Sequence, residues 1–267
     1  MQLEGSKVLL TGASGGIGKA IARALCERGA RLAITARREE VLSELCSELT
    51  GDLTPLPADL AEAGAPADLA ERAGEVDVLV ANAALPAAGR VDDFSPEEID
   101  RAIDVNLRAP IQLARLLLPG MMQRGRGHLV FISSLSGKTA SPGSGLYSAA
   151  KFGLRGFAAG VREDLVGTGV GVTVVFPGFI RDAGMFADSG LKLRKGVGTS
   201  TAEDVAAGVV RGIESGKGEI DVAPLGMRLS VKFAELAPSI GARIQRRLGA
   251  VEVSEQLADA HRRDGKL

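Results

Sequence analysis

Tyr147 is the only tyrosine in this chain of 267 residues, and it stands in the stretch LYSAAKFG, residues 146 to 153. Lys151 follows four positions later. If the stretch is helical, the two side chains lie on one face, because residues at i and i+4 are neighbours. A free phenol has a pKa of about 10, and a cation held beside it lowers that pKa. The spacing is therefore typical of a phenol that acts as an acid or base, although an exposed helix carrying both residues would look the same.

A glycine-rich turn, TGASGGIG at 11–18, lies between a β-rich run and a helical pattern. Glycines at such a turn let the backbone bend tightly and approach a ligand, and a helix that begins there favours a pyrophosphate. The spacing G-x3-G-x-G differs from the dinucleotide fingerprint GxGxxG, and the lysine of a P-loop is absent. Alone, this turn is a weak indication of nucleotide binding, because many such turns are structural.

The stretch TARRE, residues 35 to 39, ends the second β-rich run. NAD-binding sheets of this kind usually place an acidic residue there, against the ribose 2′-hydroxyl. This chain has Ala36 in that place, followed by Arg37 and Arg38. Two guanidinium groups suit a 2′-phosphate, because they form charge-assisted hydrogen bonds with phosphate oxygens. Arginines at the start of a helix are also commonly solvated, so both interpretations stay open.

Pro110 interrupts a helix that the pattern predicts from about 96 to 123. Proline has no N–H, so the carbonyl of Asn106, four residues earlier, loses its helical donor. The sequence therefore predicts a kink, and at Asn106 a polar point that can hold an ordered water.

Three serines, Ser133, Ser134 and Ser136, follow another β-rich run in ISSLSG. Ligands of open α/β sheets bind at the carboxyl ends of strands, which is where these serines are expected. These serines do not form a GxSxG elbow after the run, which argues against an α/β-hydrolase.

Short β-rich runs alternate with helical patterns, and Ser95 before Pro96 is typical of a helix start. The runs are KVLLT (7–11), RLAIT (31–35), DVLVA (77–81), HLVFIS (128–133) and GVTVVF (171–176), with LTPLP (53–57) and EIDVA (219–223) as weaker candidates. Strands separated by helices imply a parallel sheet covered on both faces. We expect an α/β, doubly wound Rossmann-type fold of about seven strands, in a single domain spanning 1–267.

Composition is that of an ordinary globular protein, with 45% hydrophobic residues, 24% charged residues and a net charge of −1. This balance gives no indication of nucleic acid or an anionic membrane as a partner. The chain shows no secretory signal and no run of about 18 apolar residues, so we expect a cytoplasmic protein without a transmembrane segment. Cys26 and Cys46 are expected as reduced core thiols. His128 and His261 stand apart from other ligand types, and no metal site is predicted.

Taken together, these residues resemble the short-chain dehydrogenase/reductase family in its non-extended form. The resemblance runs from residue 5 to about 223. After TGxxxGxG it continues, in family order, with Asp59-Leu60, Asn82-Ala83, Asn106, Ser134, Tyr147-x3-Lys151 and Pro177-Gly178. Ser134 and Tyr147 are separated by 13 residues, as is usual in the family. Two positions depart from the pattern: Ala84 replaces a glycine, and Asp182 stands where a threonine often lies near the nicotinamide amide.

The resemblance implies a catalytic set of Asn106, Ser134, Tyr147 and Lys151. Tyr147 would be the general acid in carbonyl reduction, or the base in alcohol oxidation, and Lys151 would lower its pKa and hold the nicotinamide ribose. Ser134 would, with Tyr147, contact the substrate oxygen, and Asn106 would hold a water that links Lys151 to solvent. Asp59 would contact the adenine, Asn82 would support the adenosine ribose, and Ile17 and Ile180 would line the dinucleotide. The expected cofactor-binding residues are Gly12, Ser14, Gly16, Ile17, Gly18, Arg37, Arg38, Asp59, Leu60, Asn82, Ala83, Ala84, Tyr147, Lys151, Pro177, Gly178 and Ile180.

The sequence thus predicts an oxidoreductase that transfers a hydride between NADP(H), favoured over NAD(H), and an apolar carbonyl compound or secondary alcohol. A 3-oxoacyl thioester reductase of the same mechanism is an alternative, and so is a non-catalytic NADP(H)-binding sensor, although the complete catalytic set favours an enzyme. A homodimer or homotetramer is expected. Residues 182–200 are predicted to form a substrate lid. Residues 224–267 are predicted to form a helical extension, broken at Pro238, over the substrate entrance or an oligomer interface.

Overall fold

The computed structural model describes residues 1–191, 198–247 and 256–260. Part of the predicted lid (192–197) and part of the predicted extension (248–255 and 261–267) lie outside the described residues. The strands are β1 (Lys7–Thr11), β2 (Arg31–Thr35), β3 (Leu53–Pro55), β4 (Val78–Ala81), β5 (Gly127–Ile132), β6 (Val170–Pro177) and β7 (Glu219–Val222). The helices are α1 (Gly16–Cys26), α2 (Glu39–Glu48), α3 (Ala65–Ala73), α4 (Pro96–Ile103), α5 (Ala109–Gln123), α6 (Gly145–Asp164), α7 (Gly184–Asp188), α8 (Ala202–Ser215), α9 (Leu225–Leu236) and α10 (Pro238–Arg247). Shorter helical turns are η1 (Val91–Asp93), η2 (Asp104–Arg108) and η3 (Leu135–Gly137).

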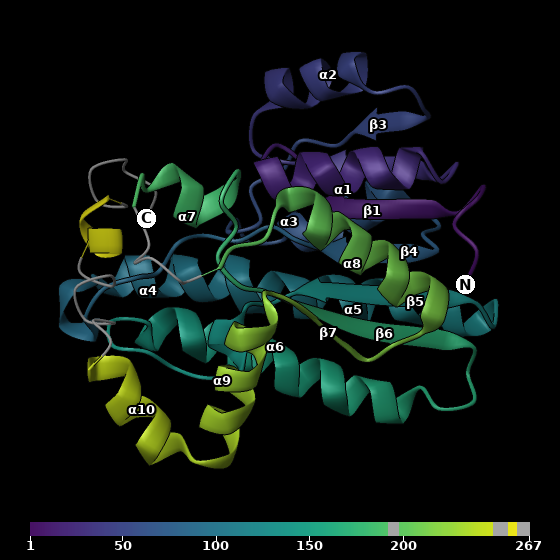
Figure 1. Ribbon diagram of the computed structural model, residues 1–267. Coiled ribbons are helices and arrows are strands. Elements are labelled where there is room, and N and C mark those ends of the chain that lie inside the picture. Colours follow the sequence, from purple (N-terminus) through teal and green to yellow (C-terminus); the bar gives the residue numbers. More distant parts are fainter. Residues whose placement is uncertain (192–197, 248–255, 261–267) are drawn as a thin grey trace.

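The seven strands form one parallel sheet in the order β3-β2-β1-β4-β5-β6-β7. Helices α1, α2 and α8 pack on one face, and α3, α5 and α6 on the other (Figure 1). This confirms the predicted doubly wound fold, including the two weaker strand candidates. The chain order reverses between β1 and β4, and the crevice outside the carboxyl ends of strands at such a switch point is where this architecture binds ligands.

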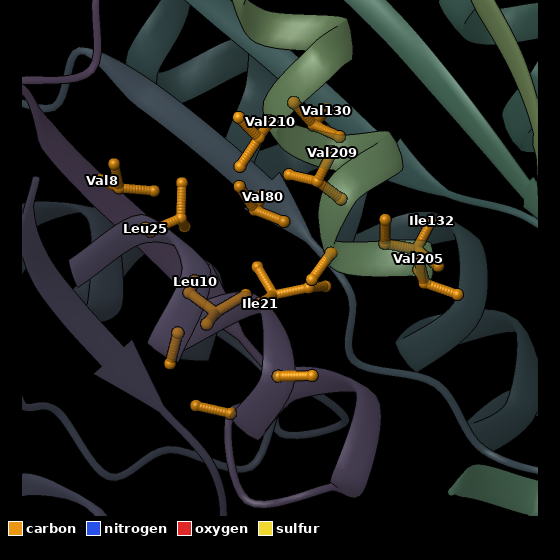
Figure 2. Packing of buried hydrophobic residues seen from close by; sticks show 14 of the residues in the cluster. Val8, Leu10, Ile21, Leu25, Val80, Val130, Ile132, Val205, Val209 and Val210 are labelled. Atoms are coloured by element: carbon orange, nitrogen blue, oxygen red, sulfur yellow. The ribbon is translucent and has the colours of Figure 1, made fainter. Parts of the chain in front are cut away.

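Both faces of the sheet are buried, which explains why its strands are continuous apolar runs rather than alternating ones. On one face, Val8 and Leu10 of β1 pack with Ile21 of α1 and Val209 of α8 (Figure 2). On the other face, alternate strand residues such as Phe131 pack under α5 and α6. The two cores hold the strand ends, and therefore the loops that follow them, in fixed positions.

The predicted helix from 96 to 123 is divided into α4, a single π-helical segment η2, and α5. Ser95 caps α4 as expected, accepting a hydrogen bond from the N–H of Glu98. The irregular segment precedes Pro110, which lies inside the first turn of α5, where its missing N–H costs little. The predicted break is therefore present, but η2 accommodates it over a full turn rather than as a sharp kink.

The two cysteines are free thiols that pack against the core, Cys26 from α1 and Cys46 from α2, and each is partly buried. Both lie on helix faces that border the core rather than point into it. Burial still raises the pKa of the Cys26 and Cys46 thiols above their usual range.

Residues 225–247 form two helices, α9 and α10, and the break between them falls at Pro238 as predicted. Both lie at the carboxyl-end side of the sheet, the side that also carries α7 (Figure 1). Among the helices of residues 1–191, 198–247 and 256–260, none is long and apolar enough to cross a membrane.

Candidate active site

The glycine-rich turn between β1 and α1 depends on three glycines because its atoms approach closely. Gly12 has φ +68, and a Cβ there would lie 2.7 Å from the Cα of Ala83. A Cβ on Gly18 would lie 2.1 Å from the carbonyl oxygen of Gly12, and one on Gly16 would lie 2.6 Å from the Cβ of Ala183. The turn is thus wedged between the end of β4 and the segment after β6, with no room for side chains.

Thr11 and Asn82 join the end of β4 to this turn. The Asn82 amide nitrogen donates to the carbonyls of Thr11 and Gly12, at 3.0 and 3.1 Å. The Thr11 hydroxyl accepts the main-chain N–H groups of Asn82 and Ala83, both at 3.0 Å. Thr11 was not among the predicted site residues, although it opens the glycine motif. The arrangement makes Asn82 a brace of the turn, a role that sequence reasoning did not assign to it.

Two features, one at the start of α1 and one at the end of β2, suit the binding of a dinucleotide. Helix α1 starts at Gly16 behind an extended Gly15, and no side chain caps its first N–H groups, which leaves them available to an anionic group. At the end of β2, the hydroxyl of Thr35 is buried without a hydrogen-bond partner among the described residues. Arg37 and Arg38, two and three residues further on, are exposed.

Asp59, which follows β3, forms an ion pair with Arg101 of α4. A guanidinium nitrogen of Arg101 donates to one carboxylate oxygen at 2.8 Å, and the N–H of Ala61 donates to the other at 3.0 Å. Burial opposes ionisation, but these bonds and the charges of Arg101 and Arg37 together lower the pKa of Asp59 below its usual range. Arg101 was not predicted from the sequence, because the pairing joins residues 42 positions apart.

Ser134 and Tyr147 come together at the carboxyl end of β5. Ser134 follows the strand, and its hydroxyl accepts the N–H of Ser136 at 3.1 Å. Tyr147 lies in the first turn of α6, and burial raises its pKa to about 12, while a hydrogen bond with the Ser134 side chain acts in the opposite direction. The phenol is therefore protonated at neutral pH.

Lys151 lies one turn further along α6 and is buried, with 2% of its surface exposed. Its Nζ lies 5.5 Å from the centre of the Tyr147 ring and donates a hydrogen bond to the Ile132 carbonyl at 3.0 Å. Burial lowers the pKa of Lys151 to about 8. The spacing argument predicts that Lys151 lowers the pKa of Tyr147. In the structure burial raises the pKa of the phenol instead, and the Lys151 amine donates its hydrogen bond to the Ile132 carbonyl.

Ser133 and Gly137 fix α6 against the end of β5. The Ser133 hydroxyl donates to the Lys151 carbonyl at 3.1 Å. A Cβ on Gly137 would lie 2.5 Å from that hydroxyl and 2.7 Å from the Lys151 carbonyl oxygen. Both residues belong to the predicted serine-rich turn, but the sequence did not show which serine holds the helix.

Asn106 lies in η2 and is buried. Its side chain forms two hydrogen bonds with the main chain of Leu85, accepting the N–H at 2.9 Å and donating to the carbonyl at 3.0 Å. The side chain thus anchors the segment after β4. The Asn106 carbonyl has no N–H donor at residue 110 because that residue is proline, and its contact with a water stays a prediction.

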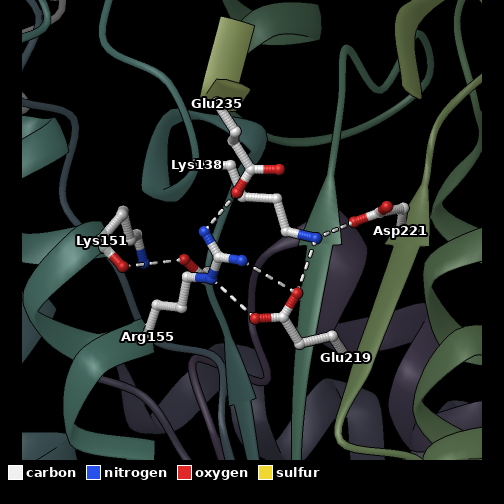
Figure 3. Close-up of polar contacts among 7 residues, drawn as sticks. Lys138, Lys151, Arg155, Glu219, Asp221 and Glu235 are labelled. Carbon is white, nitrogen blue, oxygen red and sulfur yellow. Dashed lines mark hydrogen bonds and ion pairs between the residues drawn. The ribbon is translucent and has the colours of Figure 1, made fainter. Parts of the chain in front are cut away.

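A charged network lies behind α6 and ties it to β7 and α9. Arg155 binds Glu219 of β7 through two nitrogens, at 2.7 and 3.2 Å, and Glu235 of α9 at 2.5 Å (Figure 3). Lys138, just after η3, is buried and binds Glu219 at 2.9 Å and Asp221 at 2.6 Å. Because Lys138 follows the Ser134 turn and Arg155 follows Lys151 by one helical turn, the network holds both catalytic segments against the sheet.

The remaining predicted residues lie where β6 ends. Gly178 donates its N–H to the Val222 carbonyl at 2.9 Å, and a Cβ there would lie 2.9 Å from the sulfur of Met227 in α9. Ile180 is buried in the core beside α1. Asp182 accepts the N–H of Ala202 at 3.0 Å, so it holds the start of α8. Pro177 is the last residue of β6, Leu60 follows β3 and Ala84 follows β4. The other predicted cofactor residues likewise follow a strand of the sheet or lie on α6.

Known proteins share this arrangement. A sequence profile described as short chain dehydrogenase matches residues 6–193. The chain is 35% identical over 275 residues to the ketoacyl reductase HetN of Nostoc sp., which covers 98% of this chain and 96% of that protein. It is 36% identical over 181 residues to the 3-oxoacyl-[acyl-carrier-protein] reductase FabG of Rickettsia felis, which covers 68% of this chain and 75% of the relative.

Among solved structures, a metagenomic short-chain oxidoreductase in complex with NADP aligns with a TM-score of 0.69 and 33% identity, over 84% of this chain and 99% of that one. The fold and the site are those of an oxidoreductase that acts on CH–OH or C=O groups with a nicotinamide cofactor. The chain belongs to the short-chain dehydrogenase/reductase family.

Proposed function

We propose that this protein is an NADP(H)-dependent carbonyl reductase in which Tyr147 donates the proton. The observation that carries the proposal is the position of Tyr147 on α6 beside the buried amine of Lys151, which lies 5.5 Å from the ring centre. A sensor that only bound the cofactor would have no need of a phenol and a hydroxyl placed together at the carboxyl end of the central strands.

The bound nicotinamide would supply the hydride in the direction of reduction. Ser134 donates a hydrogen bond to the carbonyl oxygen and stabilises the negative charge that develops there. Tyr147 gives its hydroxyl proton to that oxygen. Its pKa of about 12 keeps the proton in place at neutral pH, which favours the role of acid over that of base in the free enzyme. Lys151 stands beside the phenol, and its charge would stabilise the phenolate that forms.

For the substrate we propose a 3-oxoacyl thioester, or a simpler ketone with an apolar chain. Two relatives are named as ketoacyl or 3-oxoacyl reductases, and the first of them aligns over 98% of this chain. The segment after β6 also carries apolar side chains: the rings of Phe179 and Phe186 lie 5.0 Å apart, and Met227 adjoins Gly178. An apolar chain extending from the reacting carbon would pack against such groups.

For the cofactor we propose NADP(H) rather than NAD(H). Residue 36 is alanine, so no carboxylate stands at the end of β2 to repel a 2′-phosphate. Arg37 is exposed at that position, and its charge reaches Asp59. A guanidinium group close to the adenosine end would bind the phosphate and partly offset the negative charge of Asp59.

Tyr147→Phe tests the proposal. We expect kcat with NADPH and acetoacetyl thioester, or another ketone that the parent reduces, to fall by about 10² to 10⁴, the usual contribution of general acid catalysis. The dissociation constant of NADPH, measured from its own fluorescence, should stay the same because the ring remains. Turnover by the variant within about threefold of the parent would show that the proton comes from another group.

A further inference from the structure

The outer face of α9 and α10 carries an unusual concentration of exposed apolar side chains. Six of the eleven large hydrophobic residues exposed in the described parts of the chain fall between residues 225 and 247, and they are 44% to 88% exposed. They are Leu225, Leu229, Phe233 and Leu236 on α9, and Ile240 and Ile244 on α10. The spacings of four and three residues place each set on one face of its helix. A cluster of this kind, unlike scattered apolar residues, marks a surface that meets something.

The inner faces of the two helices are firmly packed, so the exposed stripe does not result from poor docking. Val231 and Ala234 are buried against the sheet side of α9, and Glu235 is paired with Arg155 of α6 (Figure 3). A Cβ on Gly241 of α10 would lie 2.7 Å from the Cβ of Ala234, so the two helices are in close contact. The stripe is therefore held outward by a fixed structure.

The charge of this segment differs from that of the whole chain. Residues 225–247 contain five basic residues, Arg228, Lys232, Arg243, Arg246 and Arg247, against one acidic residue, Glu235. That one acid is paired with Arg155 on the inner side. The overall charge of −1, from which we expected no anionic partner, conceals this local excess of positive charge.

We propose that α9 and α10 form a membrane-binding surface that lies on an anionic phospholipid bilayer. Exposed Leu, Phe and Ile side chains bordered by Lys and Arg are the pattern of helices that lie in the plane of the headgroups. The helices have 12 and 10 residues, too short to span a bilayer, which takes about 20. A second copy of the chain fits less well. A two-fold contact would bring this basic surface against itself, and like charges would face each other.

The position of the surface gives the binding a consequence for the reaction. Helix α9 begins two residues after β7 and at its start contacts Gly178, next to the predicted cofactor residues. A bilayer under α9 and α10 would thus lie beside the carboxyl ends of the strands. An apolar substrate dissolved in the bilayer would reach the site without crossing water. This delivery of substrate rests on the proposed function, whereas the membrane contact itself does not.

Vesicle binding of the full chain tests the proposal. Because the chain contains no tryptophan, Phe233→Trp introduces a single fluorophore within the stripe. We expect its emission to shift to the blue with vesicles that contain phosphatidylglycerol, and not with pure phosphatidylcholine. Val166→Trp, in the exposed turn between α6 and β6 at the amino-end side of the sheet, should not shift with either lipid.

Two triple variants separate the apolar contribution from the charged one. Leu229→Ser with Phe233→Ser and Leu236→Ser, and separately Arg243→Gln with Arg246→Gln and Arg247→Gln, should each lower co-sedimentation with anionic vesicles at least tenfold. The matched control, Val91→Ser with Met122→Ser and Val166→Ser, removes exposed apolar side chains elsewhere and should bind as the parent does. Unchanged circular dichroism and unchanged lipid-free activity would show that the variants are folded.

Three results would overturn the proposal. Absence of binding to anionic vesicles would exclude a membrane surface. If only the arginine variant lost binding, the face would be a general site for polyanions, including acidic proteins, rather than a bilayer contact. If the serine variant instead changed from oligomer to monomer in light scattering, with no vesicle binding by the parent, the occupant would be a second copy of the chain.

Discussion

A guanidinium nitrogen of Arg101, on α4, donates a hydrogen bond to the carboxylate of Asp59 at 2.8 Å, although the two residues are 42 positions apart in the sequence. The adenosine end of the cofactor is expected beside Asp59. The pair is only partly exposed, and it fixes which way the carboxylate faces. Asp59 follows β3, whose register with β2 brings it close to the arginines after β2. We therefore predict that Arg101 positions Asp59 for the cofactor without touching the cofactor itself.

Arg101→Gln should raise the KM for NADPH by about three- to tenfold and leave kcat unchanged. The size follows from a partly exposed charged pair, whose free energy is of the order of 1 kcal/mol. Arg101→Lys keeps the charge and should restore most of the affinity. Arg28→Gln, which removes the ion pair with Glu214 of α8, is the control and should have no effect on KM. A change in kcat alone would mean that Arg101 acts on the reaction instead.

Cofactor preference should depend on the residues directly after β2. Because Arg37 is exposed, we expect a contact at the lower end of the range for charged hydrogen bonds, and roughly a tenfold preference in kcat/KM for NADPH. Ala36→Asp with Arg37→Ala should abolish or reverse it, since a carboxylate there repels the phosphate and accepts the ribose hydroxyl. Arg31→Ala, at the other end of β2, should change nothing. If kcat/KM of the parent were higher with NADH, we would conclude that Arg37 and Arg38 are solvated and do not bind the cofactor.

Much of this site follows from local sequence, because most predicted residues stand directly after an apolar run or, like Tyr147 and Lys151, at helical spacing on one predicted helix. The strand positions were predicted closely, because strands buried on both faces appear in the sequence as continuous apolar runs. The pairs that hold the site were not predicted: Asn106 with Leu85, Arg101 with Asp59, and Arg155 with Glu235. Each joins elements distant along the chain, and many arginines and glutamates in the sequence could form such pairs.

The direction of the Tyr147 pKa shows the same limit. The spacing to Lys151 gives the helical neighbours correctly, but the pKa depends on how deeply the hydroxyl is buried. The burial of the hydroxyl depends on the elements that pack around α6, so it cannot be predicted from the spacing between Tyr147 and Lys151.

Absorbance titration of the phenol should give a pKa near 12 in the folded protein. Tyr147 is the only tyrosine and tryptophan is absent, so the phenolate signal belongs to this residue alone. After a rapid jump to about pH 11, roughly a tenth of the phenol should ionise while the chain is folded, against roughly nine-tenths in urea. Ser134→Ala should raise the pKa further. A folded-state pKa below 10 would mean that the charge of Lys151 outweighs burial after all.

The last prediction concerns His128, which is buried on β5 and hydrogen-bonded to the Thr173 hydroxyl at 2.8 Å. Burial lowers its pKa from 6.5 to about 4, and the nearby charges of the N-terminus and Arg162 act in the same direction. Between these two values the unfolded chain binds a proton that the folded protein excludes. The free energy of unfolding should therefore decrease as the pH falls from 6.5 to about 4, by about 3 kcal/mol in total from this residue.

Urea unfolding at several pH values measures this slope. The variant His128→Gln keeps a donor for Thr173 but does not titrate, so its stability should be nearly flat between pH 6.5 and 5, where most carboxylates remain ionised. His261→Gln, which alters the other histidine of the chain, should retain the slope of the parent. If parent and His128→Gln lost stability equally over this range, the proton would be taken up elsewhere, and His128 would be accessible to protons in the folded state.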